Sequence, residues 1–387
     1  MKAVVENVII SAENLRSYKI FIFLLIILKF PIRKDHQEGS KLHQLFQQDL
    51  ALCPECFQHE IKECLRIENE IEFTEGFEDS LNIMFGVRQT RYGIYNSTRT
   101  VIKYLFNDYK GIYGIIKSNR STMREELIDQ LFDSSRIEGL QMCSRTILDN
   151  LFGRNSLSNI VHLNVDAQPL ILPILYKHHF PVPKVLQTCG FTIYESYEGR
   201  SLTKFYNSPF DTRLQITIQL LRGVLNFTEG FNGFKIYLTD LNPDNIVYNP
   251  ETNKLTFVDL DDIIIVDSKE NTVESHRHEM IECDGCFAYS QQSICAAKSS
   301  DINLFAACQF LLEDLKRDKT KGFLYPDSED ILEEFRVIYE ILSDCVDCKG
   351  EQCESRFDLV NELIEIFEEV RDEDIPTTPT YDFAIYY

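Results

Sequence analysis

Residues 236–266 read "IYLTDLNPDNIVYNPETNKLTFVDLDDIIIV", with two acidic clusters, each next to an apolar run. Short β-branched and aromatic runs lie on both sides of the polar segment TDLNPDN, and NPETNK has the composition of a turn between two strands. The pattern predicts a β-hairpin, with Asp240 and Asn245 on the loop that enters it and Asp259 at the end that leaves it. These oxygen-bearing side chains suit Mg²⁺ or Mn²⁺, which are usually held by one or two carboxylates plus substrate phosphates.

The spacing of these three residues resembles that of protein kinases. Asp240 and Asn245 match the D-x-x-x-x-N pattern of the kinase catalytic loop, and Asp259 matches the first position of the D-F-G metal loop. The resemblance implies that Asp240 is the catalytic base and that Asn245 and Asp259 are metal ligands. The alternative is a plain hairpin whose acidic residues cap turns.

Segments upstream occur in the order of a kinase. In TRTVIKYLF, Lys103 lies inside a β-branched strand, like the kinase lysine that grips the nucleotide phosphates. The segment FTIYESYEGRSLTKFY, residues 191–206, resembles the hinge between kinase lobes, which implies that Glu195 and Tyr197 lie beside the nucleotide. A helix with Asp211 as its N-cap then leads to the catalytic loop. The implied cofactor is ATP with Mg²⁺ or Mn²⁺.

Lys103 also needs an acidic partner, which in active kinases is a glutamate on the helix after the lysine strand. The segment STMREELIDQLF, residues 121–132, predicts such a helix and offers Glu125 and Glu126. Acidic residues in a first helical turn also interact favourably with the helix dipole. Both roles therefore stay open for these two glutamates.

The twelve cysteines narrow the resemblance. The segments LCPECFQHEIKEC, QTCGF and IECDGCFAYSQQSICAAKSSDINLFAACQFLLEDL are similar to those of the divergent protein kinase domain family of the secretory pathway. Within that family, the chain is most similar to the branch known as the deleted-in-autism proteins. The similarity runs from about Leu52 to at least Cys345, and it implies a kinase-like fold located in the Golgi or outside the cell.

An even number of cysteines indicates disulfide bonds and an oxidising compartment. Zinc is the alternative, because three C-x-x-C pairs occur and His276 and His278 lie close to one of them. The segment DINLFAACQFLLEDL predicts a helix capped by Asp301. We predict that four cysteines form disulfides that hold the loop after the metal loop against this helix: Cys283, Cys286, Cys295 and Cys308.

The kinase pattern is incomplete in four places. The H-R-D triplet reads L-T-D, and D-F-G reads D-L-D, with Asp261 in place of the glycine that lets this loop bend freely. The usual lysine of the catalytic loop is Asn242, and no G-x-G-x-x-G precedes Lys103, where only Gly86 and Gly93 occur. These losses weaken the prediction of phosphoryl transfer more than that of metal-dependent nucleotide binding.

The chain has 387 residues and a formal net charge of −22. This charge argues against nucleic acid and anionic membrane surfaces as partners, because both attract basic faces. The apolar run Ile20–Leu28 is shorter than the roughly 20 residues of a bilayer span and has the length of a signal sequence. No small-residue cleavage site follows, so an uncleaved N-terminal anchor is the alternative. Sequons at Asn96, Asn119 and Asn226 agree with a luminal glycoprotein.

We therefore expect an α+β, two-lobed protein-kinase-like fold, with a small, mainly β N-lobe, a larger, mainly helical C-lobe and disulfide-rich additions. Residues 1–34 would form the signal peptide or anchor, 35–190 the cysteine-containing segment and N-lobe, 191–375 the C-lobe, and 376–387 a tail. The expected function is metal-dependent nucleotide binding in the secretory pathway or outside the cell, with phosphoryl transfer to a hydroxyl. The alternative is an inactive pseudokinase that binds a luminal or extracellular protein.

Overall fold

The computed structural model describes residues 35–74, 90–105, 114, 116, 122–133, 139–154, 156–281, 283, 286–326, 328–347 and 353–373. The chain forms two compact units, Met1–Leu45 and Phe46–Tyr387, with the boundary inside helix α2 (Asp35–Leu52). The predicted signal sequence and the predicted tail lie outside the described residues. Within those residues, every helix is too short or too polar to cross a bilayer.

An antiparallel sheet in the second unit carries Lys103. Its order is β1-β2-β3-β6-β5, and its strands are β1 (Glu72–Phe73), β2 (Thr90–Tyr95), β3 (Thr98–Tyr104), β5 (Val185–Cys189) and β6 (Thr192–Ser196). Asn96 and Ser97, both with positive φ, join β2 to β3. A tight two-residue hairpin requires this backbone, and asparagine tolerates it. The strand predicted around Lys103 is confirmed, and β6, the first strand of the segment assigned to the C-lobe, pairs with β3.

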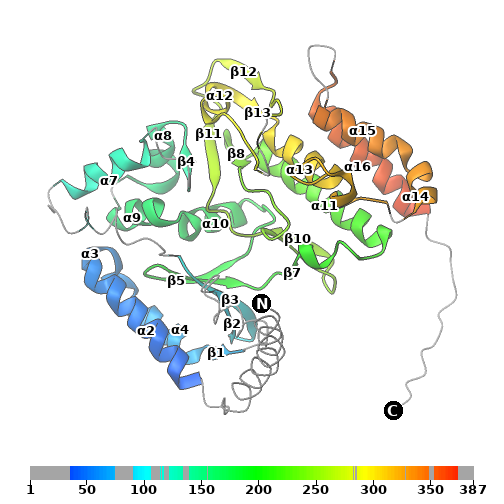
Figure 1. Ribbon diagram of the computed structural model, residues 1–387. Helices are drawn as coiled ribbons and strands as arrows, with labels where there is room; N and C mark the ends of the chain where they lie inside the picture. Colours follow the sequence, from blue (N-terminus) through cyan, green and yellow to red (C-terminus); the bar gives the residue numbers. More distant parts are fainter. Residues whose placement is uncertain are drawn as a thin grey trace, which may run out of the picture. The chain divides into compact units, whose positions relative to one another are not determined.

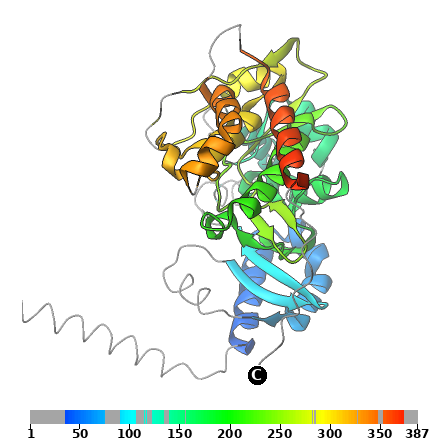
Figure 2. The same ribbon diagram turned by 90° about the vertical axis from the view of Figure 1, so that its right-hand side faces the viewer.

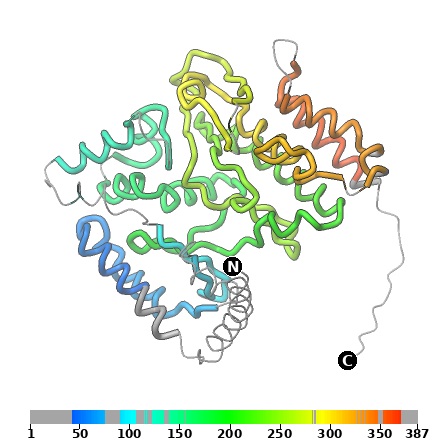
Figure 3. Tube along the Cα trace, in the orientation of Figure 1, coloured from blue at the N-terminus to red at the C-terminus, as the bar shows by residue number. Residues whose placement is uncertain are grey.

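Residues 236–266 contribute strands to two further sheets. β9 (Ile246–Asn249) and β10 (Lys254–Phe257) pair antiparallel around the predicted turn, so the hairpin is confirmed. β8 (Phe234–Leu238) and β11 (Ile263–Asp267) pair with each other. The sheets are completed by β7 (Arg200–Ser201) beside β9 and β4 (Gln141–Met142) beside β11. Figure 3 traces the path from β8 through the hairpin to β11.

The remaining elements are mostly helices. They are α3 (Pro54–Phe57), α4 (Ile61–Glu70), α7 (Met123–Leu131), α8 (Arg145–Ile147), α9 (Leu157–Val165), α10 (Gln168–Lys177), α11 (Phe210–Glu229), α12 (Gln291–Ala296), α13 (Ile302–Leu312), α14 (Glu329–Glu334), α15 (Arg336–Asp347) and α16 (Arg356–Glu373). A parallel pair of strands, β12 (Val273–His276) and β13 (Ala297–Ser300), precedes α13.

Four of these helices, α11, α13, α15 and α16, lie side by side in both views (Figures 1 and 2). Leu214, Ile218 and Leu221 of α11 are buried, as a helix with one apolar face requires. α11 begins at Phe210 after the N-cap Pro209, so Asp211 lies in its first turn and is not the cap that we predicted. Proline before the first turn is favoured because its fixed φ suits the entry of the chain.

Asp301 precedes α13 as predicted, but its side chain makes no capping hydrogen bond to that helix. One carboxylate oxygen accepts the His278 backbone N–H at 2.6 Å, and the other accepts Arg356 Nη1 at 2.6 Å. Arg356 is 2% exposed, so its charge needs such a partner. Asp301 therefore links the segment after β12 to the start of α16.

The described cysteines are all in disulfides. All four cysteines of the prediction, Cys283, Cys286, Cys295 and Cys308, are in disulfides. These bonds do not hold the loop after the metal loop against α13. The prediction of that connection is wrong, because each pair joins other elements and connectivity is not encoded in spacing. The bonds in which both cysteines lie in the described residues are Cys53–Cys56, Cys64–Cys189, Cys143–Cys295, Cys283–Cys286 and Cys308–Cys345.

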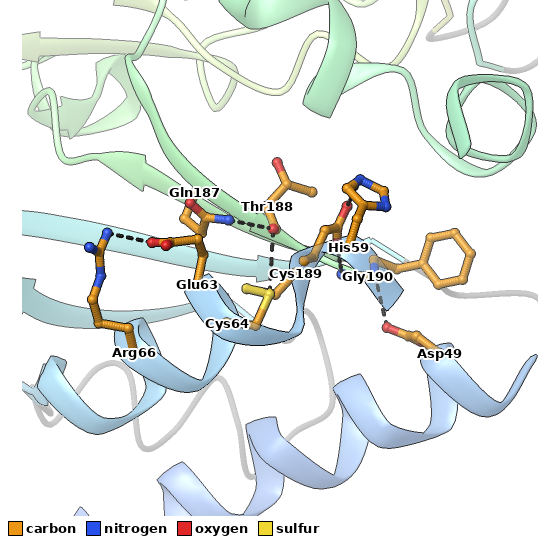
Figure 4. The surroundings of a disulfide bond; sticks show 11 residues. Asp49, His59, Glu63, Cys64, Arg66, Gln187, Thr188, Cys189 and Gly190 are labelled. Atoms are coloured by element: carbon orange, nitrogen blue, oxygen red, sulfur yellow. Dashed lines mark hydrogen bonds and ion pairs between the residues drawn. A yellow bond between two sulfur atoms is a disulfide. The ribbon is translucent and has the colours of Figure 1, made fainter. Parts of the chain in front are cut away.

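Two carboxyl groups, the buried Asp49 and the half-buried Glu60, lie near the Cys64–Cys189 bond and the β5–β6 turn. Figure 4 shows Asp49 beside Gly190 and this bond. Asp49 accepts hydrogen bonds from the Phe191 N–H and the Tyr104 hydroxyl, each at 3.0 Å. Glu60 accepts the Gly190 N–H at 2.8 Å. A side chain at Gly190 would collide with Asp49, because a Cβ there would lie 2.5 Å from a carboxylate oxygen.

Burial raises the pKa of Asp49 to about 7, and backbone and tyrosine donors only partly offset it. A carboxyl whose pKa is raised on folding binds its proton more tightly in the folded state, so its contribution to stability is present at low pH and is lost as the pH rises through 7. We expect the unfolding free energy of the wild type, relative to Asp49→Asn, to fall by up to about 1.4 kcal/mol per pH unit between pH 4 and 7.

Urea unfolding of both proteins across that range measures the difference. Glu251→Gln, a neutralised carboxylate on the exposed hairpin turn, is the control. If the difference in unfolding free energy between the wild type and Asp49→Asn stays constant with pH, Asp49 is charged in the folded protein.

Candidate functional site

The β9–β10 hairpin brings the three predicted metal and catalytic residues to one end of a strand pair. The Val258 N–H donates to the Asn245 carbonyl at 2.8 Å, which extends the ladder by one residue and places Asp259 beside Asn245. The Thr239 hydroxyl donates to the Asp262 carbonyl at 2.9 Å, which holds the loop before Asp240 against the chain that follows Asp259. Backbone pairing therefore brings together residues that are five and fourteen positions apart.

Asp240 is held by two side-chain amides of its own loop. Asn245 Nδ2 donates to one carboxylate oxygen at 2.7 Å, and Asn242 Nδ2 donates to the other at 2.8 Å. Asn245 is buried, whereas Asp240 is exposed. The loop thus fixes the direction of a carboxylate that solvent or a second molecule can reach. Asn242 replaces the kinase lysine, and it orients Asp240 through a hydrogen bond and not through charge.

Lys103 faces two carboxylates. Its Nζ lies 3.3 Å from Glu195 Oε2 and 3.6 Å from Asp259 Oδ1. Lys103 pairs with Ile193 across β3 and β6, and Glu195 is two residues further along β6. Side chains two apart in a strand share a face of the sheet, so the register itself brings Glu195 to Lys103.

Gln168, at the start of α10, links Lys103 to the acidic residues. Its Oε1 accepts a hydrogen bond from Lys103 Nζ at 3.2 Å, and its Nε2 donates to Asp259 Oδ1 at 3.3 Å. Nε2 also donates to Asp166 Oδ2 at 3.1 Å. We did not predict Gln168 or Asp166 from the sequence. The segment D-A-Q-P, residues 166–169, indicates only the start of a helix. A polar residue facing the lysine strand is visible only once α10 is placed.

The site contains more carboxyl groups than cations. Burial raises the pKa of Asp166 to about 8 and that of Asp261 to about 7, and neighbouring carboxylates add to each shift. Burial alone would lower the pKa of Lys103, but the carboxylates around it, first Glu195 and then Asp259, outweigh burial and raise it above its usual range. Burial also raises the pKa of Glu195. An added cation would relieve this excess of negative charge.

Glu195 carries an unsatisfied atom. Its Oε1 is buried and has no hydrogen-bond partner among the residues that the structure describes. Such atoms are rare, because an unpaired buried polar group loses its hydration without compensation. The face of the sheet that carries Lys103 is therefore short of a donor or a cation.

Two other predicted residues lie apart from Lys103. Glu125, on α7, is exposed, and its Oε2 lies 3.3 Å from Arg154 Nη2. The structure therefore does not bring Glu125 to Lys103. Tyr197 follows β6, where its N–H donates to the Arg99 carbonyl at 2.8 Å. The Arg99 guanidinium lies 3.9 Å from the centre of the Tyr197 ring. These contacts hold the segment after β6 against β3.

The departures from the kinase pattern have structural counterparts. Gly93 lies on β2, where a Cβ would be 3.0 Å from the Glu72 carbonyl, so it permits close approach of β1. Gly86 lies outside the described residues. Asp259 adopts a positive φ of 61°, which is uncommon outside glycine but tolerated by aspartate and asparagine. Asp262 accepts the Gly139 N–H at 2.5 Å, which attaches the D-L-D segment to the chain before β4.

A lysine on a sheet, a loop aspartate and a hairpin metal loop in this order define a protein-kinase-like class of site. Residues 160–348 match the family described as the protein-kinase domain of FAM69. The divergent protein kinase domain 2A of Homo sapiens is 26% identical over 231 residues, which is 57% of this chain and 53% of that protein. The Xenopus tropicalis protein of the same name gives the same identity and coverage. The chain spans about half the length of the curated relatives that it matches. These matches bear out the resemblance to a divergent protein kinase family.

Proposed function

We propose that the chain binds a nucleoside triphosphate together with Mg²⁺ or Mn²⁺ in a two-lobed kinase-like fold, and that it transfers a phosphoryl group to a hydroxyl. The observation that carries this proposal is the convergence of Lys103, Asp259 and Asn245, with Asp240 beside them. The unpaired Glu195 oxygen and the raised pKa of the neighbouring carboxyls support it. Each points to a positively charged group as the missing component.

The donor set fits a hard divalent cation that shares its coordination with phosphates. Among the described residues, no three His, Cys, Asp or Glu side chains form a metal site by themselves. Mg²⁺ rarely uses such a site, since it is commonly held by one or two carboxylates and by substrate phosphates. Asn245 and Asp259 would hold the cation, which would shield the phosphate charge when bound.

The remaining roles follow from position. Lys103 would contact the α- and β-phosphates, because its ammonium group lies on the same side as Asp259. Asp240 would accept the proton of the acceptor hydroxyl, because it is exposed and its carboxylate is already oriented.

An inactive pseudokinase is the second candidate, in which the fold serves as a binding scaffold for a luminal or extracellular protein. The D-L-D segment favours it, since Asp261 occupies the position where a flexible glycine is usual. The use of Gly93 for strand packing also favours it. For both candidates we propose the secretory pathway or the cell exterior, on the strength of the disulfides.

Thermal unfolding of the purified chain with ATP tests nucleotide binding. We expect ATP with Mn²⁺ or Mg²⁺ to stabilise the protein by about 2.7 kcal/mol at a hundredfold excess over Kd. ATP with a chelator, and the metal alone, should give little change, because the phosphates and the protein share the cation. Identical unfolding curves under all these conditions would leave the scaffold as the remaining function.

A further inference from the structure

Gln168 is the residue that touches both the cationic and the anionic sides of the site. It is 1% exposed, so its amide group must be satisfied by protein. The oxygen accepts from Lys103, and the nitrogen donates to Asp259 and to Asp166. The position of the amide is fixed further by its own backbone, whose N–H donates to the other oxygen of Asp166 at 2.8 Å.

The partners determine the orientation of the amide. Exchanging its oxygen and nitrogen would place the oxygen against the Asp259 carboxylate and the NH₂ group against the Lys103 ammonium, which would remove the hydrogen bonds to both. A glutamate at this position would keep the contact with Lys103 but would have no proton to donate. Its second oxygen would then lie about as close to Asp259 and Asp166 as the nitrogen does, at 3.3 and 3.1 Å. Only a carboxamide of this length can accept from Lys103 and also donate to Asp259 and Asp166.

We propose that Gln168 is a positioning residue, which holds the ammonium of Lys103 and the carboxylate of Asp259, 3.6 Å apart, in place for a metal-bound triphosphate. This inference rests on the proposed function. Without the amide link, Lys103 keeps its direct ion pairs with Glu195 and Asp259. Asp259 loses a neutral donor that fixes its position without cancelling its charge. A neutral link is suited to this task because it leaves the charge of both groups available to the ligand.

Titration calorimetry with Mn²⁺·ATP, and separately with adenosine, tests the role. We expect Gln168→Met, which preserves length and removes the hydrogen bonds, to weaken Mn²⁺·ATP binding about tenfold. Gln168→Glu should weaken it further, because it sets carboxylates against one another. Adenosine has no phosphates, so its affinity should be unchanged in both variants. General loosening of the structure would instead lower the affinity for both ligands.

Gln219→Met is the matched control. The side-chain amide of Gln219, on α11, makes two hydrogen bonds: its nitrogen donates to Asn253, and its oxygen accepts from the Leu255 N–H. These contacts link α11 to the β9–β10 hairpin. This variant should bind Mn²⁺·ATP like the wild type. Wild-type affinity in Gln168→Met, or equal losses for ATP and adenosine, would overturn the inference while leaving the proposed function in place. Absence of binding in the wild type would refute the proposed function, and the role of Gln168 with it.

Discussion

Asp259→Asn should abolish the stabilisation of the protein by ATP and Mn²⁺ and leave the fold intact. The change removes the charge that the cation would need. The fold should survive because asparagine, like aspartate, tolerates the left-handed φ of 61° at this position. Asparagine also keeps an oxygen that can accept the Gln168 hydrogen bond. Thermal unfolding with and without ligand measures both effects.

Two variants of the neighbouring loop separate binding from chemistry. Asp244→Asn is charge-matched and lies between Asp240 and Asn245, where its carboxylate accepts only the Ser201 hydroxyl in the described contacts. We expect it to bind like the wild type. Asp240→Asn should also bind nucleotide, while any phosphoryl transfer falls roughly 10²- to 10⁴-fold through loss of the base. Unfolding of Asp259→Asn without ligand would instead identify its carboxylate as a structural turn residue.

Removing the Cys308–Cys345 bond should cost about 4 kcal/mol of unfolding free energy, because it closes a loop of 37 residues between α13 and α15. Both cysteines are fully buried, and the two helices pack against each other. The test is urea unfolding of the Cys308→Ala, Cys345→Ala double variant without reductant. The unfolded chain gains the freedom that the bond had removed.

The matched control removes the Cys283–Cys286 bond in the same way. That bond spans three residues, so the same entropy argument gives only about 2 kcal/mol. Cys286 is exposed, and its replacement leaves no cavity. Equal losses in the two double variants would mean that loop closure does not determine how much these bonds stabilise the fold.

Local patterns were enough to predict the hairpin, the Lys103 strand, and the helices that begin near Met123, Phe210 and Ile302. Their signals are periodicity and turn composition, which act over a few residues. The hairpin also predicts the nearness of Asn245 and Asp259, since one ladder contains both.

The acidic partner of Lys103 could not be found in this way. It depends on the register between β3 and β6, which are separated by about ninety residues of sequence and are aligned by the whole sheet. Gln168 and Asp166 are harder still, because their position depends on how α10 packs. Helix capping signals mark where a helix begins and say nothing of what its first turn contacts.

The disulfide pattern also has a consequence for the order of events on the ribosome. Cys143 and Cys295 are 152 residues apart in the chain, and at about 5 to 20 residues per second the first waits roughly 8 to 30 s for the second. During this delay Cys189, Cys283 and Cys286 emerge as competing thiols. If Cys143 pairs early with one of these thiols, that bond must be exchanged before Cys143 can pair with Cys295.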